Sequence, residues 1–190
     1  MVDAGDFYDN DNDDYSSIAM HQWFQLYADN PNLRPRTPPI VRAMAGLGYD
    51  AVVLGNHEFV ANDKDSLGEL LLDFTDYNIP VLSANLYTSL GPYKVNYINP
   101  YIIKNVETEQ GVLNVGILGL TIKEVGETQR QQELSDLPQY KGTLELTDIV
   151  QEVKSKKWPE LMRYNGADVV IAVVHAGEES TKSKKPRQQN

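Results

Sequence analysis

The sequence contains no cysteine among its 190 residues. Disulfide bonds and thiolate metal sites are therefore excluded, and any bound metal must be held by Asp, Glu, Asn or His side chains. Histidine is also scarce, because the chain has only three. These few imidazoles narrow the search for a metal or catalytic site.

Long hydrophobic runs are absent as well. No segment approaches the roughly 18 apolar residues that a membrane-spanning helix needs, and the N-terminus lacks the pattern of a secretory signal. Positive charge is in deficit, with 17 Lys and Arg against 27 Asp and Glu, for a net charge of −10. Because phosphate backbones are bound through Lys and Arg, this balance argues against a nucleic acid polymer as partner. The negative charge is compatible with metal binding and equally with plain solubility.

The pattern of apolar segments indicates an α/β domain. With 41% apolar and 23% charged residues, the chain has the composition of an ordinary globular protein, and its length suits one domain. Strands are predicted over Val2–Ala4, 51–54, 81–84, 101–106, 113–120 and 168–174. Helices are predicted over 16–27, 39–47, 67–77 and 148–164, the last divided or kinked at Pro159. Residues 180–190 are polar, without apolar periodicity, and are predicted to form a disordered tail.

Two details of the strand pattern predict how strands are connected and placed. The turn Glu109-Gln110-Gly111 could join two strands as a hairpin. The segment Asp168–Val174 is uniformly apolar after its Asp, so it is predicted to be a central, buried strand.

Metal-competent side chains follow three of the predicted strands. Asp6 follows the first strand, Asn56 and His57 follow Ala51–Leu54, and His175 follows Val169–Val174. Ligands of open α/β sheets bind beyond the carboxyl ends of the strands. If the three strands are parallel neighbours, the four side chains converge at one edge. Oxygen and imidazole ligands of this kind suit a hard divalent cation at a phosphate-ester site.

Each candidate also has a purely structural interpretation. Asp6 could cap the helix that follows it, and Asn56 could fill a left-handed turn position. His57 could be a buried histidine with satisfied hydrogen bonds, and His175 could merely hydrogen-bond a loop carbonyl. The convergence of the four is a stronger indication than any one of them.

The chain resembles the calcineurin-like metallophosphoesterases, in particular their 5′-nucleotidase and 2′,3′-cyclic-nucleotide phosphodiesterase branch. The resemblance runs from Val2 to about Glu179. It rests on five blocks: Val2-Asp3-Ala4-Gly5-Asp6, Gly48-Tyr49-Asp50-Ala51 with Leu54-Gly55-Asn56-His57-Glu58-Phe59, Leu82-Ser83-Ala84-Asn85, Gly116-Ile117-Leu118-Gly119-Leu120-Thr121, and Val174-His175-Ala176-Gly177. It implies that residues 1–179 form part of a layered α/β catalytic domain, with mixed β-sheets flanked by helices.

The resemblance also implies roles. Asp6 matches the carboxylate that bridges two divalent cations, and Asn56 and His175 match ligands of the second cation. His57 matches the imidazole that donates to the phosphate or leaving oxygen. The activity implied is metal-dependent hydrolysis of a phosphate ester, with nucleotides as the substrate class and Zn, Mn, Mg or Fe as the metal.

Three departures from the family pattern argue against full two-metal activity in this chain. No Asp-x-His element precedes Val2, and no Gly-His-x-His element follows His175. Val60 stands where the nucleotidase branch has the Asp that orients the imidazole, and Asp63 is a nearby substitute. We therefore expect the chain to hold at most one dication and to be inactive alone.

A rival interpretation from another class is a non-catalytic α/β scaffold or binding module derived from the same fold. In this branch a separate C-terminal domain binds the base of the nucleotide, and the chain contains no such domain. The resemblance further implies that the parent protein could be exported to the periplasm or the cell surface.

Overall fold

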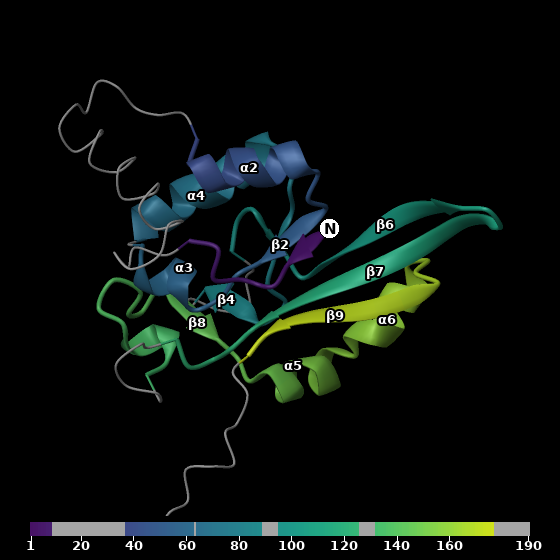
Figure 1. The fold of residues 1–190 in the computed structure, drawn as a ribbon. Coiled ribbons are helices and arrows are strands. Elements are labelled where there is room, and N and C mark those ends of the chain that lie inside the picture. Colours follow the sequence, from purple (N-terminus) through teal and green to yellow (C-terminus); the bar gives the residue numbers. More distant parts are fainter. Residues whose placement is uncertain (9–36, 63, 89–94, 126–131, 177–190) are drawn as a thin grey trace, which may run out of the picture.

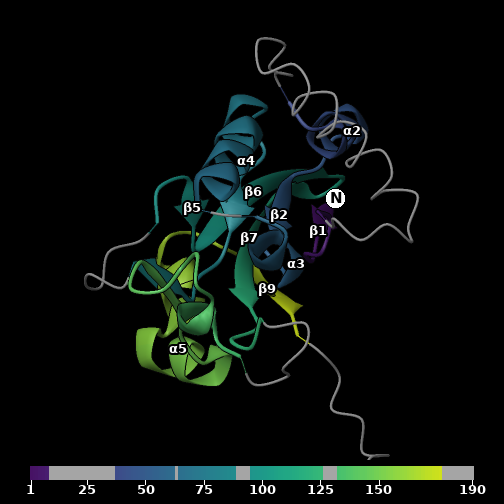
Figure 2. The same cartoon turned by 90° about the vertical axis from the view of Figure 1, so that its left-hand side faces the viewer.

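The computed structural model describes residues 1–8, 37–62, 64–88, 95–125 and 132–176. These residues form four layers, in which two helices, a four-stranded sheet, a three-stranded sheet and two further helices follow one another (Figure 1). Figure 2 shows α2 and α4 on one side of the strands and α5 on the other. The expected α/β class with mixed sheets and flanking helices is confirmed.

The first sheet is parallel and has the strand order β1-β2-β3-β5. Its strands are short: β1 (Val2–Asp3), β2 (Ala51–Val53), β3 (Val81–Leu82) and β5 (Ile98–Asn99). Helices α2 (Pro39–Leu47) and α4 (Lys64–Asp76) bury their apolar faces against one side of it. Helix α2 has a proline in its first turn and ends at Gly48, whose φ of 72° is a left-handed cap that glycine adopts at little cost.

The second sheet contains a long hairpin and one parallel strand. Strands β6 (Tyr101–Thr108) and β7 (Gly111–Thr121) pair antiparallel across the predicted turn. Strand β9 (Val169–His175) pairs with β7 in parallel. Between the sheets lie Ala51, Val53 and Leu82 from the first and Ile117 from the second.

The last helical region is divided, as predicted, but two residues before the proline. Helix α5 (Ile149–Lys156) ends at Lys157, which has a left-handed conformation, and α6 (Trp158–Tyr164) starts at the next residue. Pro159 therefore lies in the first turn of α6, where no intrahelical N–H donor is lost. Trp158 and Met162 pack α6 against β7 and against Ala167, two residues before β9.

The prediction that the segment ending in Val174 is a central strand is wrong for the described residues. The order β6-β7-β9 places β9 at an edge, and Val169 and Ile171 are 42% and 41% exposed. Val173 faces the space between the sheets and Val170 faces α6, and both are only half-buried. The other apolar residues from Val169 to Val174 are exposed, so the apolar run does not mark a buried strand within the described residues.

Smaller elements surround the ends of the first sheet. They are α3 (His57–Val60), the 3₁₀ turn Leu134–Asp136, and a two-stranded sheet of β4 (Leu86–Thr88) and β8 (Leu144–Leu146). The pairing of β4 with β8 joins residues about 60 positions apart, and local periodicity in the sequence does not reveal it. None of the helices within the described ranges is long and apolar enough to span a membrane. The helix expected over 16–27, the tail 180–190, Asp63 and Gly177 lie outside the described residues.

Candidate functional site

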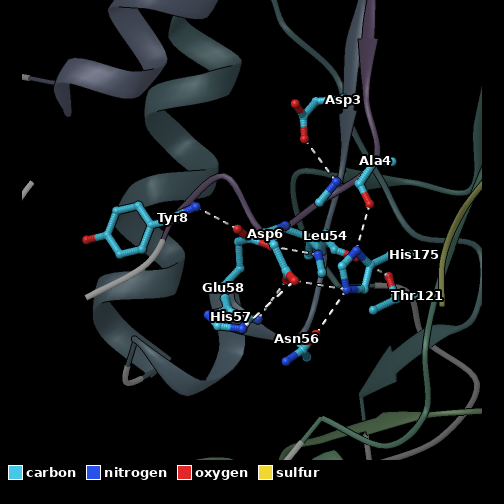
Figure 3. A network of polar contacts seen from close by, with 12 residues as sticks. Asp3, Ala4, Asp6, Tyr8, Leu54, Asn56, His57, Glu58, Thr121 and His175 are labelled. Atoms are coloured by element: carbon cyan, nitrogen blue, oxygen red, sulfur yellow. Dashed lines mark hydrogen bonds and ion pairs between the residues drawn. The ribbon is translucent and has the colours of Figure 1, made fainter. Parts of the chain in front are cut away.

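The structure brings Asp6, Asn56 and His175 together (Figure 3). Asp6 lies just beyond β1, Asn56 stands between β2 and α3, and His175 is the last residue of β9. The three strands do not belong to one sheet as supposed, because β9 is part of the second sheet. The side chains still meet, because the two sheets are stacked so that β9 ends on the same side as β1 and β2.

The His175 imidazole joins the three segments. Its Nδ1 lies 2.9 Å from the carbonyl oxygen of Ala4, and its Nε2 lies 2.9 Å from Asn56 Oδ1 and 3.3 Å from Asp6 Oδ2. A backbone carbonyl can only accept a hydrogen bond, so Nδ1 carries a proton. In the neutral ring the Nε2 lone pair then points at two further acceptor oxygens. Three lone pairs directed at one place require a proton or a metal cation between them.

The pKa values of the pair reflect this arrangement. The hydrogen bond to Asp6 raises the pKa of His175, against the opposing effect of burial. Burial would raise the pKa of the Asp6 carboxyl, but the hydrogen bond from His175 and the backbone N–H of His57 outweigh it, so that pKa is lowered. Both shifts favour the protonated imidazole of His175 beside the ionised carboxylate of Asp6.

The donor atoms fit one divalent cation. Ligands about 2.1 Å from a metal lie about 3.0 to 3.4 Å from each other in octahedral or tetrahedral geometry. The spacings of 2.9 and 3.3 Å around Nε2 are close to that range. A metal-binding histidine also commonly donates its other N–H to a backbone carbonyl, as His175 does to Ala4. No cluster of three or more acidic or His side chains within the described ranges could hold a metal, so the amide of Asn56 is needed to complete even one site.

His57 lies beside this donor set, at the start of α3. Its backbone N–H donates to Asp6 Oδ1 at 3.1 Å, and its Nε2 is 3.9 Å from Asp6 Oδ2. The side chain is 28% exposed, so the imidazole is accessible from the solvent. Val60 is half-buried, and the suggested substitute Asp63 lies outside the described residues.

The structural alternatives are partly resolved. Asn56 has φ −76° and ψ −30°, a right-handed conformation, so it does not fill a left-handed turn position. The left-handed conformation belongs instead to Asp6, with φ 60°. His175 does contact a loop carbonyl, but with only one of its two nitrogens.

Glu58 is a residue of this region to which sequence reasoning assigned no role. It is fully buried, and its carboxylate accepts backbone N–H groups from Gly55 at 2.6 Å, Tyr8 at 2.8 Å and Asp6 at 3.0 Å (Figure 3). Burial raises the pKa of Glu58 to about 7, while these three N–H groups favour the ionised form and limit the rise. In the sequence, the indication of such a role is that Glu58 directly follows the candidate catalytic residue His57.

A second buried network fixes the ends of the strands. Thr121, the last residue of β7, donates through its hydroxyl to the carbonyl of Leu54 at 2.8 Å. Asn85 accepts the N–H of Thr121 at 3.0 Å and donates to the carbonyls of Thr121 and Thr147 at 2.7 and 2.8 Å. Ser83 adds a hydroxyl contact to Thr121 at 3.0 Å. These bonds hold the end of β2, and hence Asn56, against the second sheet.

The chain was compared with known proteins. No protein-family model matches it. A 5′-nucleotidase from Vibrio cholerae is 31% identical over 73% of this chain and 22% of its own length. A snake venom 5′-nucleotidase from Gloydius brevicauda is 34% identical over 93% of this chain and 24% of its own length. The chain thus spans about a quarter of the length of these curated relatives.

A solved structure supports the same assignment. The calcineurin-like phosphoesterase YfkN from Bacillus subtilis has a TM-score of 0.56 and 24% identity, over 94% of this chain and 61% of that one. Its likeness shows that this chain shares the layered fold of that structure. Together with the nucleotidase relatives, it shows that the chain belongs to the calcineurin-like phosphoesterase family, in the 5′-nucleotidase branch.

The close approach of the two loops gives a testable prediction about Gly55. A Cβ atom there would overlap the Asp6 carboxylate and lie 2.6 Å from the Asp6 nitrogen. We expect Gly55→Ala to lower the free energy of unfolding by about 1–3 kcal/mol, as overpacking does elsewhere. Urea unfolding, monitored by circular dichroism, measures this change in the free energy of unfolding.

The matched control is Gly68→Ala in α4, where nothing lies within 4 Å of the added atom. That variant should gain up to about 1 kcal/mol, since alanine favours the helix. A Gly55→Ala chain as stable as the wild type would show that the loops are not in this contact.

Proposed function

We propose that this chain carries part of the metal centre of a nucleotide phosphoesterase, whose whole protein hydrolyses phosphate esters in the manner of its nucleotidase relatives. The observation that carries the proposal is the convergence of His175 Nε2, Asn56 Oδ1 and Asp6 Oδ2 on one place. The family to which the chain belongs is generally dependent on divalent metals. The metal identity stays open among Zn, Mn, Mg and Fe.

Asp6, Asn56 and His175 would hold one divalent cation. When bound, such a cation supplies Lewis acidity toward a phosphoryl oxygen. The anionic Asp6 offsets part of its charge, whereas the neutral Asn56 leaves the site positive enough to admit a phosphate dianion. The Ala4 carbonyl holds the proton on Nδ1 of His175, so Nε2 stays available as a ligand.

His57 would act on the substrate itself. Its Nε2 lies 3.9 Å from Asp6 Oδ2 and its side chain is 28% exposed, so it would be within reach of a phosphate ester bound to the same cation. A protonated imidazole there can hydrogen-bond a phosphoryl oxygen and give its proton to the leaving oxygen. The departing alcohol would be a nucleoside if the substrates are those of the relatives. We assign recognition of the nucleotide base to a separate domain, as the resemblance to the nucleotidase branch implies.

Export of the parent protein is part of the proposal. One relative is a snake venom protein, and another solved relative is a 5′-nucleotidase precursor from Thermus thermophilus. Both names agree with a nucleotidase that works outside the cytoplasm.

Titration with Mn²⁺ tests the donor set. Isothermal titration calorimetry of the chain should show a single site of 1:1 stoichiometry, and binding should be lost in Asn56→Ala and His175→Ala. A matched control is Asn105→Ala, which removes an exposed side chain of β6 and should leave the titration unchanged. Two tight sites, or one site that persists in both site variants, would contradict the proposed ligands.

Metal-dependent binding of AMP separates the phosphoesterase interpretation from the scaffold interpretation. The Mn²⁺-loaded chain should bind AMP, in competition with inorganic phosphate, and the metal-free chain should not. We expect phosphate release no faster than with Mn²⁺ alone, because the described residues supply ligands for one cation rather than two. Steady turnover that Asn56→Ala abolishes would contradict this expectation, and an absence of AMP binding would favour the scaffold.

A further inference from the structure

The carboxylate of Glu58 is bonded to both loops that carry the candidate ligands. Gly55 and Asp6 donate their N–H groups to Oε2, and Tyr8 donates to Oε1. Gly55 directly precedes Asn56, and Asp6 is itself a candidate ligand. One buried anion therefore crosslinks the segment after β1 to the segment after β2, about 50 positions apart in the sequence (Figure 3).

These bonds act at a part of the backbone with an uncommon conformation and a close contact. Asp6 has φ 60°, a conformation that residues other than glycine adopt rarely. A Cβ on Gly5 would lie 2.5 Å from the Gly55 nitrogen, so the two loops touch backbone to backbone. Among the described residues, Glu58 is the side chain whose carboxylate accepts N–H groups from both sides of this contact.

We propose that Glu58 is a positioning residue, which holds the Asp6 and Asn56 loops at the spacing that one divalent cation requires. The inference rests on the proposed function, because it assigns Glu58 a role in the same metal centre. Glu58 is not placed among the ligands, because it is fully buried and its carboxylate is directed at the N–H groups of Gly55, Asp6 and Tyr8. It acts through the backbone of the residues that are.

The choice of a carboxylate follows from the donors. Three N–H groups converge on two oxygens, and only an ionised carboxylate presents acceptors alone. A glutamine of the same size would turn an NH₂ group toward at least one of those N–H groups. The loop on that side would have to move, and the donor atoms would separate with it.

Glu152 provides a matched control. It is also buried, at 3% exposure, and its carboxylate also accepts three hydrogen bonds. The donors are the Tyr87 hydroxyl at 2.6 Å, the Thr147 hydroxyl at 3.0 Å and the Trp158 indole N–H at 3.1 Å. These bonds join β4 and α6 to the start of α5, and none of the donors belongs to the ligand loops.

The experiment compares Glu58→Gln with Glu152→Gln in the whole chain. Urea unfolding without metal gives the stability of each variant, and Mn²⁺ titration gives its affinity for the cation. Both variants should be less stable than the wild type. Only Glu58→Gln should bind Mn²⁺ more weakly, by roughly 10- to 100-fold, as for other residues that orient metal ligands. Unchanged affinity in Glu58→Gln, or an equal loss in Glu152→Gln, would overturn the inference.

Amide hydrogen exchange of the wild-type chain tests the same inference without a variant. The N–H groups of Gly55, Asp6 and Tyr8 should be protected in the metal-free protein, although they lie in loops. Fast exchange of all three would overturn the role of Glu58 even if Glu58→Gln fails to fold. If the wild-type chain does not bind Mn²⁺, the proposed function fails, and the exchange rates alone decide whether Glu58 crosslinks the loops.

Discussion

The hydrogen bond between His175 Nδ1 and the carbonyl of Ala4 is the interaction on which the site depends. It fixes the proton on one nitrogen and turns the other nitrogen toward Asn56 and Asp6. It also ties the end of β9, in the second sheet, to the loop after β1, in the first. If this bond were lost, the imidazole could rotate, and the lone pairs would no longer share a centre.

The fold supports this bond by stacking the two sheets so that β2, β7 and β9 end on the same side. Ala51, Val53 and Leu82 pack against Ile117 between the sheets, with Val173 close by. Thr121 and Asn85 then link the ends of β2 and β7 through buried hydrogen bonds. The apolar layer thus sets the distance between the sheets, and the polar network fixes the register of the loops. A cation would bind atoms that are already close to their final positions.

The sequence predicted the parts of this arrangement that depend on neighbouring residues. Helix Pro39–Leu47 was predicted with its final bounds, because the proline pair and the following glycine mark both ends. The β6–β7 hairpin followed from its turn. The convergence of Asp6, Asn56 and His175 followed from the rule that ligands collect beyond strand ends, although the assumed single sheet was wrong.

The remaining features depend on contacts between distant segments. The edge position of β9 is decided by its pairing with β7, which an apolar run does not encode. The small β4–β8 sheet joins residues about 60 positions apart. The role of Glu58 required knowing that Gly55, Asp6 and Tyr8 point their N–H groups at it. Sequence alone identifies the side chains with suitable chemistry, whereas their hydrogen-bond partners come from the tertiary fold.

The central claim is that three side chains from two sheets share one cation. Crystals of the chain soaked in Mn²⁺ and measured at the manganese absorption edge test it most directly. The account predicts one strong anomalous peak between the Asp6 carboxylate, the Asn56 amide oxygen and His175 Nε2, about 2.1–2.2 Å from each of them. A map with no anomalous peak between these three atoms would contradict the account.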